Sequence, residues 1–124
     1  MGFKSGSDNL SRLTVGPGAT EVDSIKYNIR SDPAAVITVL STDYCIVVTA
    51  ANTQAVTVNL EAAATAGAGR VLQIKSGTDR SGEGDITIEA AGSETIDGAL
   101  TATGFQGVNV SLTIICDGTT WWKI

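Results

Sequence analysis

Apolar and polar residues alternate in several short stretches of this chain, and such alternation predicts β-strands. In one stretch Val56, Val58 and Leu60 alternate with Thr57 and Asn59. Because successive side chains of a strand point to opposite faces, this strand should have one apolar and one polar face. We therefore expect it to be buried on one side only.

The longest alternation lies near the C-terminus. Its apolar positions share one parity, at Val108, Val110, Leu112, Ile114 and Cys116. Asp117-Gly118 is a hairpin signal, so residues 119–124 should return as the last strand. In that strand Trp121 and Trp122 should point to opposite faces, one into the core and the other toward solvent or a partner.

Other short runs predict further strands. β-Branched residues at 35–40 and 44–49 flank Ser41-Thr42-Asp43, a turn composition that predicts a hairpin. Residues 71–75 and 86–89 are also expected to be strands.

The segments between these runs are less regular. Residues 61–66 favour one or two helical turns, which Gly67 and Gly69 should end. The ten polar residues 76–85 should form an exposed, mobile loop. No internal repeat recurs at a fixed period, so we do not expect a solenoid.

Composition agrees with a β-rich fold. Aromatic residues make up 5% of the chain, and 16 threonines and 14 glycines accompany frequent Val and Ile, so β-branched and turn-forming residues dominate over helix formers. A chain of 124 residues should be a single domain. We expect an all-β fold, a small antiparallel β-sandwich or barrel-like domain.

The first 35 residues differ from the rest. Their apolar residues follow no sustained period, and their four basic and four acidic residues balance. We expect residues 1–35 to be a partly extended N-terminal arm and residues 36–124 to be the β-rich body. The alternative is that part of the arm, such as residues 24–29, is another strand of the body.

Charge and hydropathy argue against two classes of partner. The net charge is −5, and residues 36–124 carry nine acidic against four basic residues, which would repel the phosphates of nucleic acid. The longest apolar run, Cys45–Val48, is far shorter than the roughly 20 residues that span a bilayer. We expect neither nucleic-acid nor membrane binding, and we expect assembly in a cytoplasm.

Candidate chemistry is sparse. The chain has no histidine, the usual general base near neutral pH, so we do not expect an enzyme, and a carboxylate pair acting on sugars ranks last. The loop 79–85 spaces oxygen donors as a calcium site does, but it lacks the closing Glu and contains Arg80. We expect no catalytic residues, no metal and no cofactor.

The two cysteines, Cys45 and Cys116, are far apart in the sequence and show no CxxC spacing. We expect two free, buried thiols, because a reducing cytoplasm disfavours the disulfide that would otherwise stabilise the fold by about 3–4 kcal/mol.

Residues 55–124 contain an ordered series of short motifs: N-L at 59–60, an Ala-rich turn running to A-G-A-G-R at 66–70, I-T-I at 86–88, T-I-D-G at 95–98 and a terminal D-G-T-T-W at 117–121. In this order they resemble a module of bacteriophage fibres and virion surface proteins. The resemblance implies a trimeric β-structure, and so a homotrimer here, with Trp121 and Trp122 at the oligomer interface.

A chain of this length that begins with Met1 is expected to be too short for a long tail fibre. The resemblance therefore implies a structural virion protein on the capsid surface, a capsid decoration protein or short head fibre. Its arm would bind the major capsid protein through Phe3, Leu10, Leu13 and Val15. The alternative is a tail-fibre tip that binds a receptor or host surface glycan through Trp122 or the 76–85 loop.

Overall fold

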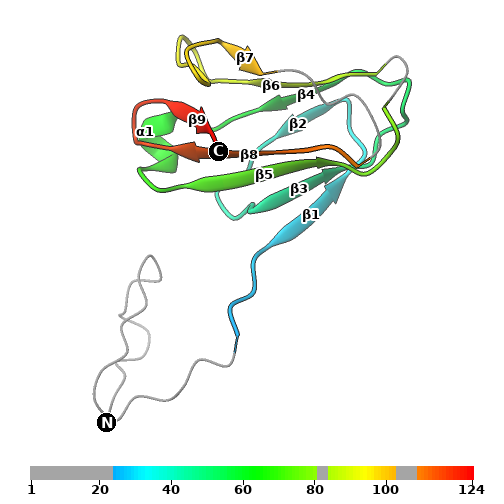
Figure 1. Cartoon of the computed structure of the whole chain (residues 1–124), viewed down its shortest axis with the longest axis horizontal. Coiled ribbons are helices and arrows are strands. Elements are labelled where there is room, and N and C mark those ends of the chain that lie inside the picture. Colours follow the sequence, from blue (N-terminus) through cyan, green and yellow to red (C-terminus); the bar gives the residue numbers. More distant parts are fainter. Residues whose placement is uncertain (1–23, 81–83, 103–108) are drawn as a thin grey trace.

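The structure, a computed structural model, describes residues 24–80, 84–102 and 109–124. They form two β-sheets packed face to face (Figure 1). The five-stranded sheet has the order β1 (Ile29–Asp32), β3 (Cys45–Val48), β5 (Val71–Ser76), β8 (Ser111–Cys116) and β9 (Trp121–Lys123). The four-stranded sheet has the order β2 (Val36–Thr38), β4 (Val56–Asn59), β6 (Ile86–Glu89) and β7 (Thr101–Ala102). The predicted all-β class is confirmed; α1 (Ala63–Ala66) is one short helix among these strands.

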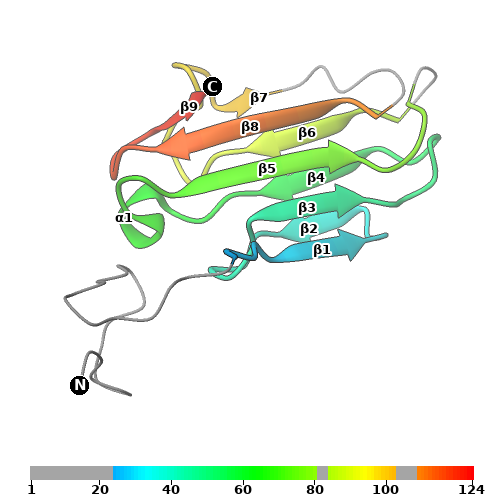
Figure 2. The ribbon, with the colours of Figure 1, turned by 60° about the horizontal axis from the view of Figure 1, so that its bottom comes forward.

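The chain alternates between the sheets as it advances. Strands β1, β3 and β5 pair in parallel in one sheet, and β2, β4 and β6 pair in parallel in the other. Each successive pair of strands thus completes one coil of a two-sheet stack, as in a β-solenoid (Figure 2). Antiparallel pairing is found where β7, β8 and β9 join the stack, so the expectation of an antiparallel sandwich was wrong for the first six strands.

Two further expectations about topology were wrong. The runs at 35–40 and 44–49 do not form a hairpin, because β2 and β3 lie in different sheets. The expectation that the chain is not a solenoid was also wrong, because its parallel coils are those of a short β-solenoid. Ile29 pairs with Cys45, but Cys45 pairs with Gln73, so the coils differ in length. Loops of unequal size explain why the sequence shows no fixed period.

The core lies between the sheets and follows the predicted alternation. Val56, Val58 and Leu60 are buried, and so are Ile114 and Cys116. The two adjacent tryptophans point to opposite sides as predicted: Trp121 is 0% exposed and Trp122 is 46% exposed. The rest of the core is mainly Ile and Val from both sheets, at Ile37, Val39, Ile46, Val48, Ile74, Ile86, Ile88 and Ile96.

The body begins earlier than expected. Strand β1 lies inside residues 1–35, the predicted arm, and pairs with β3 along its whole length. Part of this stretch is therefore a strand of the body, as the alternative held, although the strand is Ile29–Asp32 and not 24–29. Residues 1–23 lie outside the part of the chain that the structure describes.

The two ends of the stack differ. At the open end, defined as residues 24–40 with β1 and β2, each of these strands is the edge of its sheet. At the capped end, defined as residues 95–102 and 117–124 with β7 and β9, a turn closes the stack. Ile96 in this turn forms a parallel bridge with Trp121 of β9. Figure 2 shows β1 and β9 at opposite ends of the molecule.

Candidate functional site

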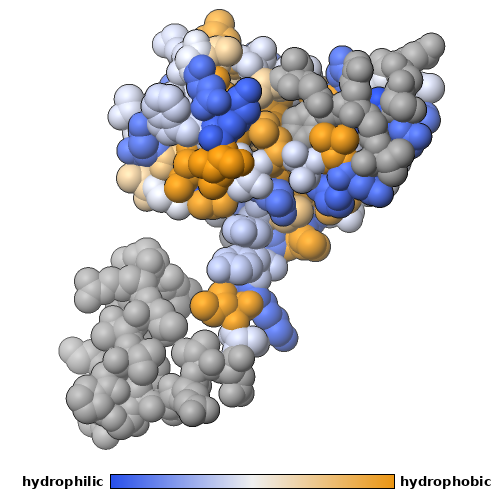
Figure 3. Space-filling view, viewed as in Figure 1, coloured by the Kyte–Doolittle hydropathy of each residue, from blue (hydrophilic) through white to orange (hydrophobic). Residues whose placement is uncertain are grey.

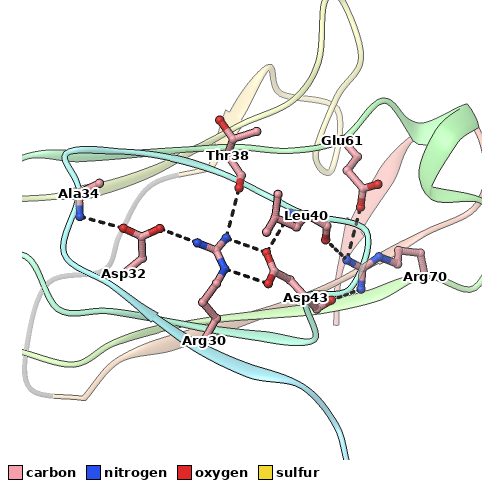
Figure 4. Close-up of polar contacts among 8 residues, drawn as sticks. All are labelled: Arg30, Asp32, Ala34, Thr38, Leu40, Asp43, Glu61 and Arg70. Carbon is pink, nitrogen blue, oxygen red and sulfur yellow. Dashed lines mark hydrogen bonds and ion pairs between the residues drawn. The ribbon is translucent and has the colours of Figure 1, made fainter.

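A partly buried polar network anchors the open end to the body (Figure 4). Nε and Nη2 of Arg30, on β1, donate to Oδ1 and Oδ2 of Asp43 at 3.0 and 2.7 Å. Nη2 of Arg30 also donates to the carbonyl of Thr38 on β2 at 3.2 Å. Two parallel hydrogen bonds between a guanidinium and a carboxylate form a strong and geometrically specific pair. Arg30 thereby joins the first strands of the two sheets.

Asp43 is the centre of this network and is 1% exposed. Burial by itself raises the pKa of the Asp43 carboxyl, but the hydrogen bonds from Arg30 and from the backbone N–H of Leu40 outweigh it, so the pKa lies below its ordinary value. Asp43 therefore stays ionised and keeps the corner between β2 and β3 closed.

Arg70 supports the same corner from the start of β5. It donates to the backbone carbonyls of Asp43 and Leu40, and its Nη2 lies 3.4 Å from Oε1 of Glu61. The arginine at the end of the A-G-A-G-R motif thus stabilises the β2–β3 corner through hydrogen bonds. The two glycines of the motif lie in the connection from α1 to β5.

The predicted exposure of the 76–85 loop holds for Gly77 and Asp79 but was wrong for other described residues of the loop. Arg80 and Ser76 are both 0% exposed. Nη1 of Arg80 donates to the carbonyls of Gln54 and Gly84 at 2.8 and 2.7 Å, and Nη2 donates to Ala50 at 3.0 Å. Burial lowers the pKa of Arg80, an effect that the charge of Asp85 opposes. Arg80 therefore ties the β5–β6 loop to the β3–β4 loop.

The capped end is held by contacts between two motifs that lie far apart in the sequence. The backbone N–H of Trp121 donates to the carbonyl of Thr95 at 3.0 Å, and that of Asp97 donates to the carbonyl of Trp121 at 3.0 Å. Oδ1 of Asp97 accepts the N–H of Lys123 at 2.9 Å. The T-I-D-G turn thus covers the outer edge of β9, the strand that begins at Trp121, the last residue of D-G-T-T-W.

Asp117 fixes the exposed tryptophan beside this cap. Its Oδ2 accepts the indole N–H of Trp122 at 2.8 Å, and its Oδ1 accepts the N–H groups of Thr119 and Thr120. These hydrogen bonds, from Trp122 first, lower the pKa of the Asp117 carboxyl. Because its indole N–H is already bonded, Trp122 presents an apolar ring that needs no polar partner.

Exposed apolar side chains gather at the two ends of the stack. Five lie at the open end, Ile25, Tyr27, Ile29, Val36 and Leu40, and three at the capped end, Leu100, Trp122 and Ile124. Figure 3 shows apolar surface along the stretch that leads into β1 and on the body near the C-terminus. Exposed apolar surface that is concentrated at particular places marks interaction sites more often than scattered single residues do.

The predicted site residues fall in different places. Phe3, Leu10, Leu13 and Val15 lie outside the described residues. Placing Trp121 at an oligomer interface was wrong, because its side chain fills the core of its own subunit. Trp122 is at the surface, and an interface there stays a prediction. The two buried thiols are free, as predicted.

Two features are absent from the described residues. Within residues 24–80, 84–102 and 109–124, no group of three or more His, Cys, Asp or Glu side chains could hold a metal ion. Over the same residues, no helix has the length and apolar character needed to cross a membrane.

No family model matches the chain, and no curated protein matches it.

Proposed function

We propose that this chain is a structural protein of a bacteriophage particle, a capsid decoration protein or short head fibre that binds the assembled capsid and catalyses no reaction. The observation that carries the proposal is the contact between two of the motifs that resemble the virion module. T-I-D-G and D-G-T-T-W are separated in the sequence, yet Thr95 and Asp97 bond directly to Trp121 in the cap.

The remaining motifs also occupy structural positions. Asn59 is the last residue of β4 and Leu60 follows it, α1 is the Ala-rich turn, and Arg70 of A-G-A-G-R bonds to the β2–β3 corner. A series of motifs that forms the corners and the cap of one fold supports a shared architecture. It does so more strongly than five short matches that are unrelated in space.

The proposed mechanism is mass action. Many copies that bind the assembled shell, and not its free subunits, stabilise the shell by their binding free energy. The arm would contact the major capsid protein, and the chain would assemble in the host cytoplasm as a homotrimer. Residues 24–28 lead into β1 at the open end, which lies opposite the capped end (Figure 2).

A second candidate function follows from Trp122. Its ring is 46% exposed and is oriented by Asp117, which suits a flat apolar ligand such as one face of a sugar ring. A tip that binds a host surface glycan would use this ring, and the arm would then serve only for attachment.

The test is removal of residues 1–20. Under the capsid-binding proposal the truncated chain keeps its circular dichroism spectrum but no longer co-sediments with phage heads that lack the protein. The double variant Leu10→Asp, Leu13→Asp should reproduce this loss in a chain of full length.

Co-sedimentation of the truncated chain at the level of the full chain would contradict the proposal. The glycan alternative predicts instead that binding to a glycan array survives truncation and is lost in Trp122→Ala.

A further inference from the structure

The two ends of the stack are complementary in what they expose. All eight of the large apolar side chains that are exposed among the described residues belong to one end or the other. The inner strands of the two sheets, β3, β4, β5, β6 and β8, contribute none of them. A monomer in water would be expected to scatter such side chains over its surface.

The backbone differs between the ends as well. At the capped end the edge of β9 is covered, because the backbone N–H and carbonyl of Trp121 are hydrogen-bonded to the backbone of Thr95 and Asp97. At the open end, β1 and β2 pair on one side only, within the described residues. An uncovered sheet edge bordered by apolar side chains is a surface that natural proteins protect or use for association.

Charge provides the third observation. Lys26 is the exposed charged side chain of the open end, since Arg30 is bonded to Asp43 and Asp32. At the capped end Asp97 and Asp117 are exposed, and Lys123 lies 4.0 Å from Asp97. The carboxylate of Asp117 is bonded to N–H donors and keeps its charge. The open end is therefore basic at its surface and the capped end acidic.

We infer that a second copy of this chain is the partner: the open end of one copy packs against the capped end of the next, Ile29 and Val36 against Trp122 and Leu100, with Lys26 facing Asp117. This contact is heterologous, so it closes into a ring when the rotation between neighbours allows and otherwise continues as an open series. Pairing two open ends instead would bring Lys26 of each copy together and leave the capped ends uncovered.

The inference is independent of capsid binding. If the chain assembles in this way but binds no phage head, the head-to-tail contact is supported and the proposed function is contradicted. A closed ring of three would agree with the proposed homotrimer, whereas an open series would contradict the trimer and keep the head-to-tail contact.

The test uses the full chain and two variants that each damage one end. Ile29→Asp places a carboxylate on the open end, opposite the acidic capped end, and Trp122→Ser removes the exposed ring. Both positions are exposed, so both variants should keep the wild-type circular dichroism spectrum. Native mass spectrometry should give an oligomer for the wild type and a monomer for each variant.

An equimolar mixture of the two variants decides the question. Each retains the end that the other lacks, so the mixture should form a dimer that contains one copy of each variant. Ala64→Asp, an exposed position on α1 away from both ends, is the matched control and should keep the wild-type mass.

Three results would overturn the inference. The first is a wild type that remains monomeric at high concentration, as it would if another protein covers these ends. The second is an oligomer that survives both substitutions. The third is a mixture that stays monomeric, which would show that an intact open end does not bind an intact capped end.

Discussion

Arg80 is buried in this small fold and Arg30 is partly buried, and the two are bonded in different ways. Arg30 forms its bonds mainly with carboxylates, whereas the described bonds of Arg80 go to three backbone carbonyls. A buried charge without good partners is costly, so such side chains are retained where they fix geometry. Here each arginine fixes a junction between loops or strands of neighbouring coils.

Asp43→Asn should lower the free energy of unfolding by about 3 kcal/mol at pH 7, because it removes the buried carboxylate that bonds the partly buried Arg30 guanidinium at two points. Urea denaturation measures this loss. Asp97→Asn is the matched control, since the half-exposed pair with Lys123 is longer and should contribute less than about 1 kcal/mol.

The same variant has a defined pH dependence. The pKa of Asp43 is lowered in the folded chain, so its stabilising contribution is complete above the pKa of the unfolded chain and is lost as pH falls through the folded-state pKa. The stability difference between wild type and Asp43→Asn should therefore shrink on acidification below the ordinary carboxyl pKa. A difference that grows there would show that Arg30 does not stabilise the ionised form.

The adjacent tryptophans give a second prediction. Trp121→Ala should cost about 3–5 kcal/mol because it empties a large volume in the core. Trp122→Ala should cost about 1 kcal/mol, since the ring is half exposed and loses one hydrogen bond. Thermal unfolding of the two variants checks the contrast, and equal losses would contradict the placement of the rings.

The alternation of apolar and polar positions along the chain was enough to predict which face of a strand individual apolar residues occupy. It put Cys116 on the apolar face and separated Trp121 from Trp122, as the structure confirms. It could not find Asp43 or Arg80, because both lie in polar stretches whose composition is that of a solvated turn. Their burial depends on acceptors and donors supplied by loops from other coils, which no local pattern reveals.

At the scale of elements, the corners between the sheets determine the topology. Alternation of residue type locates a strand and its two faces, but it does not say which strand pairs with which. Residues 41–43 have the composition of a hairpin turn, yet Asp43 uses its carboxylate to hold Leu40 and Arg30. The chain therefore crosses from one sheet to the other at this point instead of turning back.

A glycine at another corner provides a test. A Cβ atom at Gly84 would lie 2.5 Å from the carbonyl oxygen of Asn52 and 2.6 Å from that of Gln54, so Gly84→Ala should cost about 2–3 kcal/mol through displacement of the backbone. It should also weaken the Arg80 contacts. Chemical denaturation measures the loss.

Gly92→Ala is the control for this substitution. A Cβ atom at Gly92 would meet no atom within 4 Å, but the φ of Gly92 is +57°. The substitution should therefore cost about 1 kcal/mol, the free energy needed to hold an alanine in the left-handed backbone conformation. A loss at Gly84 no larger than that at Gly92 would contradict the close approach of the two loops.

At the scale of the whole molecule, the two thiols report on different parts of the structure. Cys116 belongs to the core cluster, while Cys45 is buried outside it, and burial raises the pKa of the Cys45 thiol. Both should react slowly with a thiol reagent in the native state. Cys45 should react first, through local opening, and Cys116 only with global unfolding.

Mass spectrometry after timed labelling in increasing urea checks this order. Cys45→Ser and Cys116→Ser identify which thiol has reacted. Equal rates at all urea concentrations would show that the molecule opens only as a whole.

The order in which strands join the stack has a consequence for synthesis on the ribosome. The parallel coils from β1 to β6 use residues in the order in which they emerge, so each coil can pack on the one before it. Strands β8 and β9 come last and return to the edge of β5. Until they arrive, that edge remains uncovered, and a nascent or prematurely ended chain would expose it to other chains in the cell.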